Sequence, residues 1–232
     1  MTKIRGIIFD MDGVLIDARD WHYEALNRAL ALFGHGISRN AHQSEFDGLP
    51  TRDKLIRLNI SHDLPASLHE FINRMKQVYT LQMVAERCHP VTDHQLALIN
   101  LKDQGYQLAV ASNSIRASVD TMLKKAELQA YLDFTLSNED VKRGKPHPEI
   151  YHQAIARMKL MPQECVVIED NPHGIAAATA AGAHVLCVKS PVEVKISNIN
   201  NFISMCDGIM RHNPFGKNGP HKVQVVKYVA QL

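Results

Sequence analysis

A short apolar run near the N-terminus ends abruptly in two aspartates, and this junction limits what the chain can fold into. Residues 7–9 are Ile-Ile-Phe, and Asp10 and Asp12 follow with one residue between them. In a strand, side chains alternate between the two sides, so both carboxylates would project together just beyond its carboxyl end. Two acids this close repel each other unless a cation or a shared proton compensates. The pair therefore predicts a metal ligand, a nucleophile and a proton donor in one place, although an acidic turn would show the same residues.

Apolar runs that suit strands alternate with helical patterns over most of the chain. We expect strands within residues 4–9, 106–111, 131–136, 165–168 and 184–188. We expect helices between them over residues 92–105, 115–126, 149–158 and 174–181. Continuous apolar strands separated by helices are typical of a parallel sheet covered by helices on both faces. The sequence therefore predicts an α/β fold.

The stretch from about residue 17 to residue 85 shows helical patterns only. Apolar residues recur at helical spacing in three segments, which begin near residues 21, 51 and 66. This block predicts a small all-helical domain inserted after the first strand. Residues 189–232 are less clear, and 222–232 fit either a strand or a terminal helix.

Polar clusters follow three of the expected strands. These clusters are Asp10 with Asp12, Ser112 with Asn113, and Glu169 with Asp170. In open parallel sheets, ligands bind outside the carboxyl ends of the strands, where the strand order reverses. Each cluster alone is equally typical of a turn or a helix cap. Their expected convergence, together with Lys145 between a glycine and a proline, favours a functional site.

The residue types in this site suit phosphoryl transfer. Carboxylate oxygens are hard ligands for Mg²⁺, which also binds phosphate, and Ser112 can donate to phosphate oxygens at a helix start. Asp10 can attack phosphorus and form an aspartyl-phosphate. Asp12 can donate a proton to the leaving oxygen and later take one from water. Mg²⁺ and Lys145 would stabilise the charge on the equatorial oxygens.

These motifs resemble the haloacid dehalogenase superfamily, in particular its beta-phosphoglucomutase-like and phosphoglycolate-phosphatase-like branch. The matching segments occur in the family's order, at residues 9–15, 111–114, 144–151 and 167–170. The resemblance implies a Rossmann-like catalytic core with an inserted helical cap that determines substrate specificity. The core would comprise residues 1–16 and 88–232, and the cap would comprise residues 17–87.

The resemblance also implies roles for individual residues. Asp10 would be the nucleophile and Asp12 the general acid and base. Mg²⁺ would be held by the Asp10 carboxylate and the Asp12 backbone carbonyl, with Asp170 as a ligand and Glu169 beside them. The phosphoryl group would be bound by Ser112, Asn113 and Lys145. In the cap, the residues that match substrate-binding positions are His22, Thr51 and Arg52.

The chain also departs from the family pattern. Many relatives carry Glu in the stretch where residues 18–20 are Ala-Arg-Asp, which affects the contacts at the hinge between core and cap. Mutases place an arginine at the position of Thr51, whereas this chain has Arg52 one residue later.

The expected activity is therefore that of a Mg²⁺-dependent phosphatase acting on a small phosphorylated metabolite, such as a sugar phosphate. A sugar-phosphate mutase is the first alternative, because the two differ in whether the closed cap excludes water. A catalytically silent binding protein on the same fold is the second. A dehalogenase is disfavoured by the acid at Asp12, and a phosphonatase by the absence of a convincing apolar setting for Lys54 or Lys76.

Charge and composition argue against other classes of protein. The net charge of +2 and the lack of a basic stripe with interleaved aromatics argue against a nucleic-acid partner. No run approaches the roughly 20 apolar residues that span a membrane, and no signal peptide is recognisable. The four cysteines form no CxxC pair, which indicates reduced, buried thiols. We therefore expect a cytoplasmic protein, and a monomer since no exposed apolar stripe is identifiable.

Overall fold

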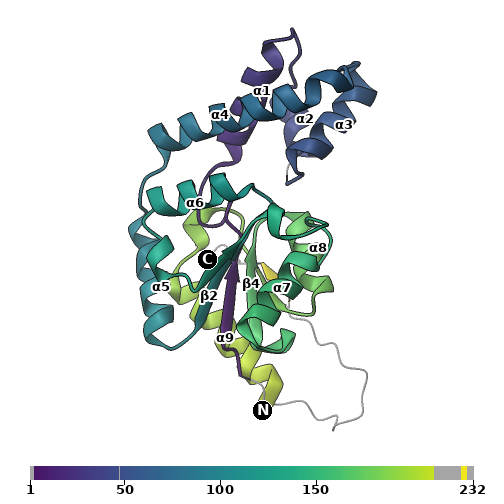
Figure 1. Cartoon of the computed structure of the whole chain (residues 1–232). Coiled ribbons are helices and arrows are strands. Elements are labelled where there is room, and N and C mark those ends of the chain that lie inside the picture. The colour runs from purple at the N-terminus through teal and green to yellow at the C-terminus, as the bar shows by residue number, and fades with distance from the viewer. Residues whose placement is uncertain (1–2, 47, 212–225, 229–232) are drawn as a thin grey trace.

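The core of the protein is a parallel six-stranded sheet with the strand order β3-β2-β1-β4-β5-β6. The computed structural model describes residues 3–46, 48–211 and 226–228, and Figure 1 shows the sheet below a group of helices. The strands are β1 (Gly6–Phe9), β2 (Gln107–Ala111), β3 (Phe134–Leu136), β4 (Cys165–Glu169), β5 (His184–Cys187) and β6 (Val226–Tyr228). All neighbouring strands pair in parallel. The predicted α/β fold is confirmed.

Helices occupy most of the remaining described chain. They are α1 (Arg19–Ala31), α2 (Arg39–Ala41), α3 (Thr51–His62), α4 (His69–Arg87), α5 (Thr92–Asp103), α6 (Arg116–Lys125), α7 (Glu149–Met158), α8 (Pro172–Ala180) and α9 (Ile196–Arg211). A π-helical turn (His42–Phe46) and short 3-10 segments link them, at Ala66–Leu68, Gln129–Tyr131, Asn138–Asp140, Pro162–Glu164 and Pro191–Glu193. Within the described residues, no helix has the length and hydropathy that crossing a membrane requires.

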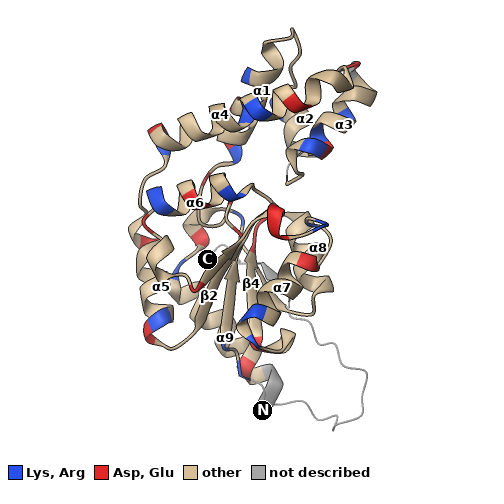
Figure 2. Cartoon of the chain, viewed as in Figure 1, with Lys and Arg blue, Asp and Glu red and all other residues tan. Residues whose placement is uncertain are grey.

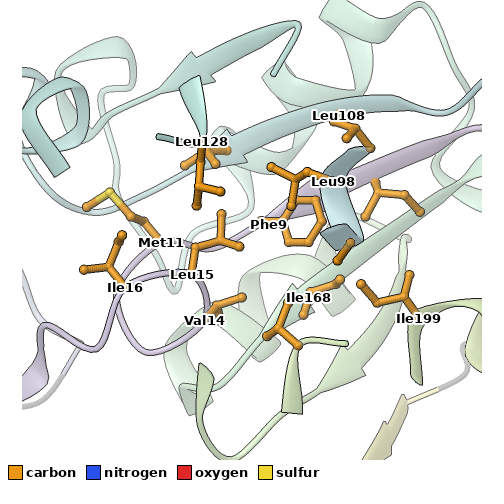
Figure 3. Close-up of a cluster of buried hydrophobic side chains, with 14 of the residues drawn as sticks. Phe9, Met11, Val14, Leu15, Ile16, Leu98, Leu108, Leu128, Ile168 and Ile199 are labelled. Atoms are coloured by element: carbon orange, nitrogen blue, oxygen red, sulfur yellow. The ribbon is translucent and has the colours of Figure 1, made fainter. Parts of the chain in front are cut away.

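The strands bury both of their faces because alternate side chains point to opposite sides. Phe9 and Ile168 lie in an apolar cluster with residues of α5, α6 and α9. Ile8 and Val167 lie in a second cluster, with residues of α7 and α8. Figure 3 shows Phe9 in the middle of the first cluster, with Leu98 beside it. Helices therefore cover both faces of the sheet, as Figure 1 also shows.

Every element described between Arg19 and Arg87 is helical, as the sequence pattern predicted. Helices α1, α3 and α4 share an apolar cluster that includes Leu26, Leu55 and Ile72. Because this cluster is separate from those of the sheet, we propose the division into a core (1–16 and 88–232) and a cap (17–87). In the following, "cap" means residues 17–87.

The structure differs from the sequence prediction mainly near the C-terminus. Helix α9 buries Ile199, Phe202 and Cys206, which have helical spacing, although asparagines among them resemble a turn. The segment 222–232 contains the strand β6, and its remaining residues lie outside the described part of the chain. Helix α3 has Pro50 as its N-cap and Thr51 as its first residue, in agreement with the segment predicted to begin near residue 51.

Candidate active site

The carboxyl ends of the central strands bring the predicted polar clusters together. Phe9 pairs with Val110 on one side and with Ile168 on the other, so the residues that follow these strands lie at one level of the sheet. Figure 2 shows acidic residues in red at these strand ends, below the cap helices. A cavity of about 180 Å³ lies between cap and core. All the predicted site residues line it: Asp10, Asp12, His22, Thr51, Arg52, Ser112, Asn113, Lys145, Glu169 and Asp170.

Lys145 is the central cation of the core side of this cavity. Its Nζ lies 2.5 Å from Asp10 Oδ1 and 2.7 Å from Glu169 Oε1, and the lysine is buried. Burial opposes its charge, but Asp10 and Glu169 outweigh burial and raise the pKa of Lys145 to about 12. Lys145 is therefore a fixed positive charge beside the candidate nucleophile.

Asp10 itself lies among more negative charge than Lys145 balances. Burial raises the pKa of Asp10, the Lys145 ammonium opposes this effect, and Glu169, Asp170 and Asp12 raise it further. A divalent cation at this position would remove much of that electrostatic penalty. The charge balance of the site thus favours a bound metal ion.

The donor atoms and the backbone around them fit Mg²⁺. Oxygens of Asp10, Glu169 and Asp170 lie within 4.8 Å of one another, and such hard oxygen ligands suit this ion. Two glycines let the backbone approach these carboxylates closely. A Cβ on Gly13 would lie 2.1 Å from Asp170 Oδ2, and one on Gly174 would lie 1.7 Å from Glu169 Oε1.

Glu169 already has several hydrogen-bond donors around it. Tyr151 donates its hydroxyl to Oε1 at 2.6 Å, in addition to Lys145, and the backbone N–H groups of Asp170 and Asn171 donate to Oε2. This leaves Asp10 and Asp170 with the better access to a metal ion. Glu169 is placed to hold Lys145 and the following loop. Tyr151 was not predicted as a site residue, although it lies in the segment 144–151 that matches the family.

Arg19 from the cap contacts the same acidic cluster and was also missed as a site residue. Its Nη2 lies 2.6 Å from Asp170 Oδ2, and its side chain is 39% exposed. Arg19 lies in the stretch 18–20 that departs from the family pattern, but nothing in the sequence indicated its contact with Asp170. A cation at this position bonds to a carboxylate that an acid would repel.

Asp12 points away from this acidic cluster and toward the cap. Its Oδ1 lies 3.0 Å from His22 Nε2, and its Oδ2 accepts a 2.8 Å hydrogen bond from the Ser114 hydroxyl. On the other side of the ring, Lys76 Nζ lies 3.1 Å from His22 Nδ1. Because an ammonium only donates, Nδ1 accepts from Lys76, and Nε2 carries the proton that is donated to Asp12.

These contacts set the charge of Asp12. Burial favours the neutral acid, but His22, the Ser114 hydroxyl and Lys76 together lower the pKa of Asp12. For His22, burial and Lys76 lower the pKa, and Asp12 opposes them. The arrangement therefore favours an ionised Asp12 beside a neutral imidazole.

Two cap lysines are buried at the cavity, although the sequence showed no convincing apolar setting for either of them. Lys54 is 6% and Lys76 is 7% exposed. Lys54 Nζ lies 3.3 Å from His42 Nε2, so histidines, and not an apolar pocket, contact both ammonium groups. Burial, followed by Lys54, lowers the pKa of His42 to about 3.

Asn113 joins the core to the cap. Its Nδ2 donates to the Gly48 and Lys145 carbonyls at 3.2 Å, and its Oδ1 accepts from the Lys145 N–H at 2.9 Å. Through these bonds the Asn113 amide positions Lys145 and the Gly48 backbone, which precedes α3. Ser112 is buried, and its hydroxyl accepts from the Ser114 N–H.

Comparisons with known proteins agree with this geometry. A family model described as haloacid dehalogenase-like hydrolase matches residues 7–188. A phosphorylated carbohydrates phosphatase from Thermotoga maritima is 30% identical over 77% of this chain and 82% of the relative. A probable pseudouridine-5'-phosphatase from Saccharomyces cerevisiae is 29% identical over 82% and 84%. The crystal structure of a beta-phosphoglucomutase from Clostridium difficile shares the fold, with a TM-score of 0.76 at 23% identity over 87% of this chain and 98% of that one.

Proposed function

Since the chain belongs to the haloacid dehalogenase-like hydrolase family, we propose that it is a Mg²⁺-dependent phosphatase of small phosphorylated metabolites, with sugar phosphates among the candidates. Two relatives with phosphatase names, from Thermotoga maritima and Saccharomyces cerevisiae, match it over most of their length. The observation that carries the proposal is Asp10, held 2.5 Å from the buried Lys145 in a cavity that also contains three further carboxylates.

In the proposed reaction, Asp10 attacks phosphorus and becomes an aspartyl-phosphate, which water then hydrolyses. Lys145 and Ser112 orient the phosphoryl group and stabilise the charge on its oxygens. Asp10 and Asp170 would hold the metal ion, with the Asp12 carbonyl as a further ligand. When bound, Mg²⁺ supplies positive charge that lowers the repulsion between the phosphate and the carboxylates.

Asp12 would transfer the protons of both steps. In the first step it must carry the proton that the leaving oxygen takes, and burial favours that neutral form. In the second step it accepts a proton from the attacking water, and the bonds from His22 and Ser114 favour the resulting ionised form. Burial and the hydrogen bonds thus favour opposite protonation states of the same carboxyl group, and a residue that serves as acid and then as base needs both states.

The experiment is phosphate release from a panel of phosphate monoesters with Mg²⁺ present. We expect Asp10→Asn to reduce turnover by at least about a thousandfold, as loss of a nucleophile does, while circular dichroism shows an intact fold. Asp103→Asn, at the exposed end of α5, removes a charge far from the cavity and should retain full activity. Turnover that survives in Asp10→Asn would refute the nucleophile assignment.

The same assay separates the two alternatives. Isomer formation from an aldose 1-phosphate that depends on a bisphosphate activator would identify a mutase. Equal inactivity of the wild type and Asp10→Asn over the whole panel would favour a silent binding protein.

A further inference from the structure

Arg19 is the first residue of the cap helix α1, and it is bonded to a carboxylate of the core. Its Nη2 lies 2.6 Å from Asp170 Oδ2, and Asp170 belongs to the acidic cluster that would hold a metal ion. Arg19 also lies close in the chain to residue 16, where the first segment of the proposed core ends. The contact therefore joins the beginning of the cap to a candidate ligand of Mg²⁺.

Two other polar contacts between cap and core do not involve the oxygens of this acidic cluster. His22 bonds to Asp12, whose carboxylate points away from the cluster, and the Gly48 carbonyl accepts from Asn113. A metal ion in the cluster would leave the atoms of both contacts in place. Of these three contacts, the one made by Arg19 is therefore the one that responds directly to the metal.

The guanidinium of Arg19 supplies positive charge to the cluster when no metal is bound. Lys145 bonds to two of the three carboxylates, those of Asp10 and Glu169, and Arg19 bonds to the third. The Asp170 side chain is only 3% exposed, so water solvates its charge poorly, and a buried carboxylate needs a partner. In the metal-free protein, Arg19 thus provides part of the compensation that a metal ion would provide.

A bound Mg²⁺ would weaken the contact between Arg19 and Asp170. A divalent cation is the largest local charge in such a site, and it repels a guanidinium on the same carboxylate. The oxygen that accepts from Arg19 is also close to the backbone, since a Cβ on Gly13 would lie 2.1 Å from Asp170 Oδ2. The Arg19 side chain is 39% exposed, so its charged end can turn into water when Asp170 binds the metal.

We propose that Arg19 is a latch that holds the beginning of the cap on the core in the metal-free protein, and that Mg²⁺ releases this latch by competing for Asp170. The inference rests on the proposed function only through the metal site. Coupling between two equilibria is reciprocal, so removal of the latch must strengthen metal binding. If the closed latch excludes the metal, a two- to fivefold gain in Mg²⁺ affinity corresponds to a latch that is closed in about 50–80% of metal-free molecules.

Trp21 reports on this latch, because it lies two residues after Arg19 and packs against an apolar cluster of the sheet. It is the single tryptophan of the chain. We expect Mg²⁺ to shift the emission of Trp21 in the wild type to longer wavelength, over the concentration range in which titration calorimetry shows Mg²⁺ binding. Added NaCl keeps the ionic strength constant, so that screening does not change. The emission of Arg19→Gln should start at the value of the Mg²⁺-loaded wild type and should not shift further.

Arg87→Gln is the matched control, since Arg87 bonds to Glu24 on the same helix α1 and both residues lie within the cap. Its emission should respond to Mg²⁺ as that of the wild type does. The latch is refuted if the wild type binds Mg²⁺ without a shift in emission, or if Arg19→Gln shows the full shift of the wild type.

Both measurements work without turnover, which separates the latch from the proposed function. If Mg²⁺ shifts the emission only in the proteins that keep Arg19, but no phosphate ester is hydrolysed, the latch stands and the phosphatase proposal fails. If esters are hydrolysed and Mg²⁺ binds without a shift, the latch fails and the phosphatase proposal stands. If calorimetry detects no Mg²⁺ binding, the latch fails together with the proposed metal site.

Discussion

Replacing Lys76 with methionine should make the protein more stable and the enzyme less active. Lys76 lies on α4 with only 7% of its surface exposed, between His22 and Lys54. Methionine has a similar length and fills the same space without a charge. Burial and the charge of Lys54 lower the pKa of Lys76 from 10.5 to about 7, and Asp12 acts in the opposite direction. The folded state therefore disfavours the charged lysine.

The size of the stability effect follows from that change in pKa. At about 1.4 kcal/mol for each tenfold change in proton affinity, the fall from 10.5 to about 7 corresponds to at most about 5 kcal/mol. Water penetration and local relaxation reduce such penalties. The variant also loses the 3.1 Å hydrogen bond to His22, which contributes about 1 kcal/mol. We therefore expect Lys76→Met to raise the free energy of unfolding at pH 6 by about 2 kcal/mol.

The advantage of the variant should decrease as the pH rises. Above about pH 7 the folded wild type releases the proton of Lys76, whereas the unfolded chain keeps it up to about pH 10. Because the unfolded state then binds more protons, this group makes the stability of the wild type increase with pH between about 7 and 10.5. We expect the difference between variant and wild type to fall by about half between pH 6 and pH 9.

Urea unfolding at pH 6 and pH 9 measures both effects. Fluorescence of Trp21, the single tryptophan, reports on the junction between α1 and the core, because Trp21 packs against an apolar cluster of the sheet, and far-UV circular dichroism reports on the whole chain. Lys124→Met on α6 is the control, since Lys124 is exposed and its removal should change the free energy of unfolding little. A less stable Lys76→Met variant at pH 6, or an advantage that grows with pH, would refute the reasoning. Its kcat/KM should fall, because the proton donor to His22 is lost.

Two further substitutions test the acidic cluster of Asp10, Glu169 and Asp170 as a metal-binding site. Arg19→Gln should strengthen Mg²⁺ binding by about two- to fivefold, since the partly exposed guanidinium competes for Asp170 at 2.6 Å; titration calorimetry without substrate measures this, and weaker binding would contradict it. Gly174→Ala should lower the activity, and it should lower the free energy of unfolding by roughly 2 kcal/mol or more, because its Cβ would lie 1.7 Å from Glu169 Oε1. Gly208→Ala is the control in thermal unfolding, as its Cβ meets no atom within 4 Å.

The core side of the site could be predicted because local sequence determines it. A short, continuous apolar run has few alternatives to forming a strand that is buried on both faces. The carboxyl end of that strand then determines at which edge of the sheet the next residue lies. Asp10 and Ser112 follow such strands and Glu169 is the last residue of one, so the parallel register alone brings them to one edge. Helix α7 was predicted with its bounds, Glu149–Met158, because its apolar spacing is regular and a proline precedes it.

The cap side was less predictable because it depends on how helices face the core. Lys76 lies four residues after the buried Ile72 and four before the buried Thr80, so helical spacing does place it on the buried face of α4. A lysine at such a position is normally assigned to the surface. The burial of Lys54 and the contact of Arg19 with Asp170 depend on the docking of cap helices, which no local pattern encodes.

The contacts of Asp12 connect these two halves of the site. Asp12 follows a core strand, but two groups that tune its proton affinity, His22 and Lys76, lie on the cap helices α1 and α4. A movement of the cap away from the sheet would remove both groups, so that burial would no longer be opposed by them, and the proton affinity of Asp12 would change. The position of the cap and the proton affinity of Asp12 are therefore electrostatically coupled.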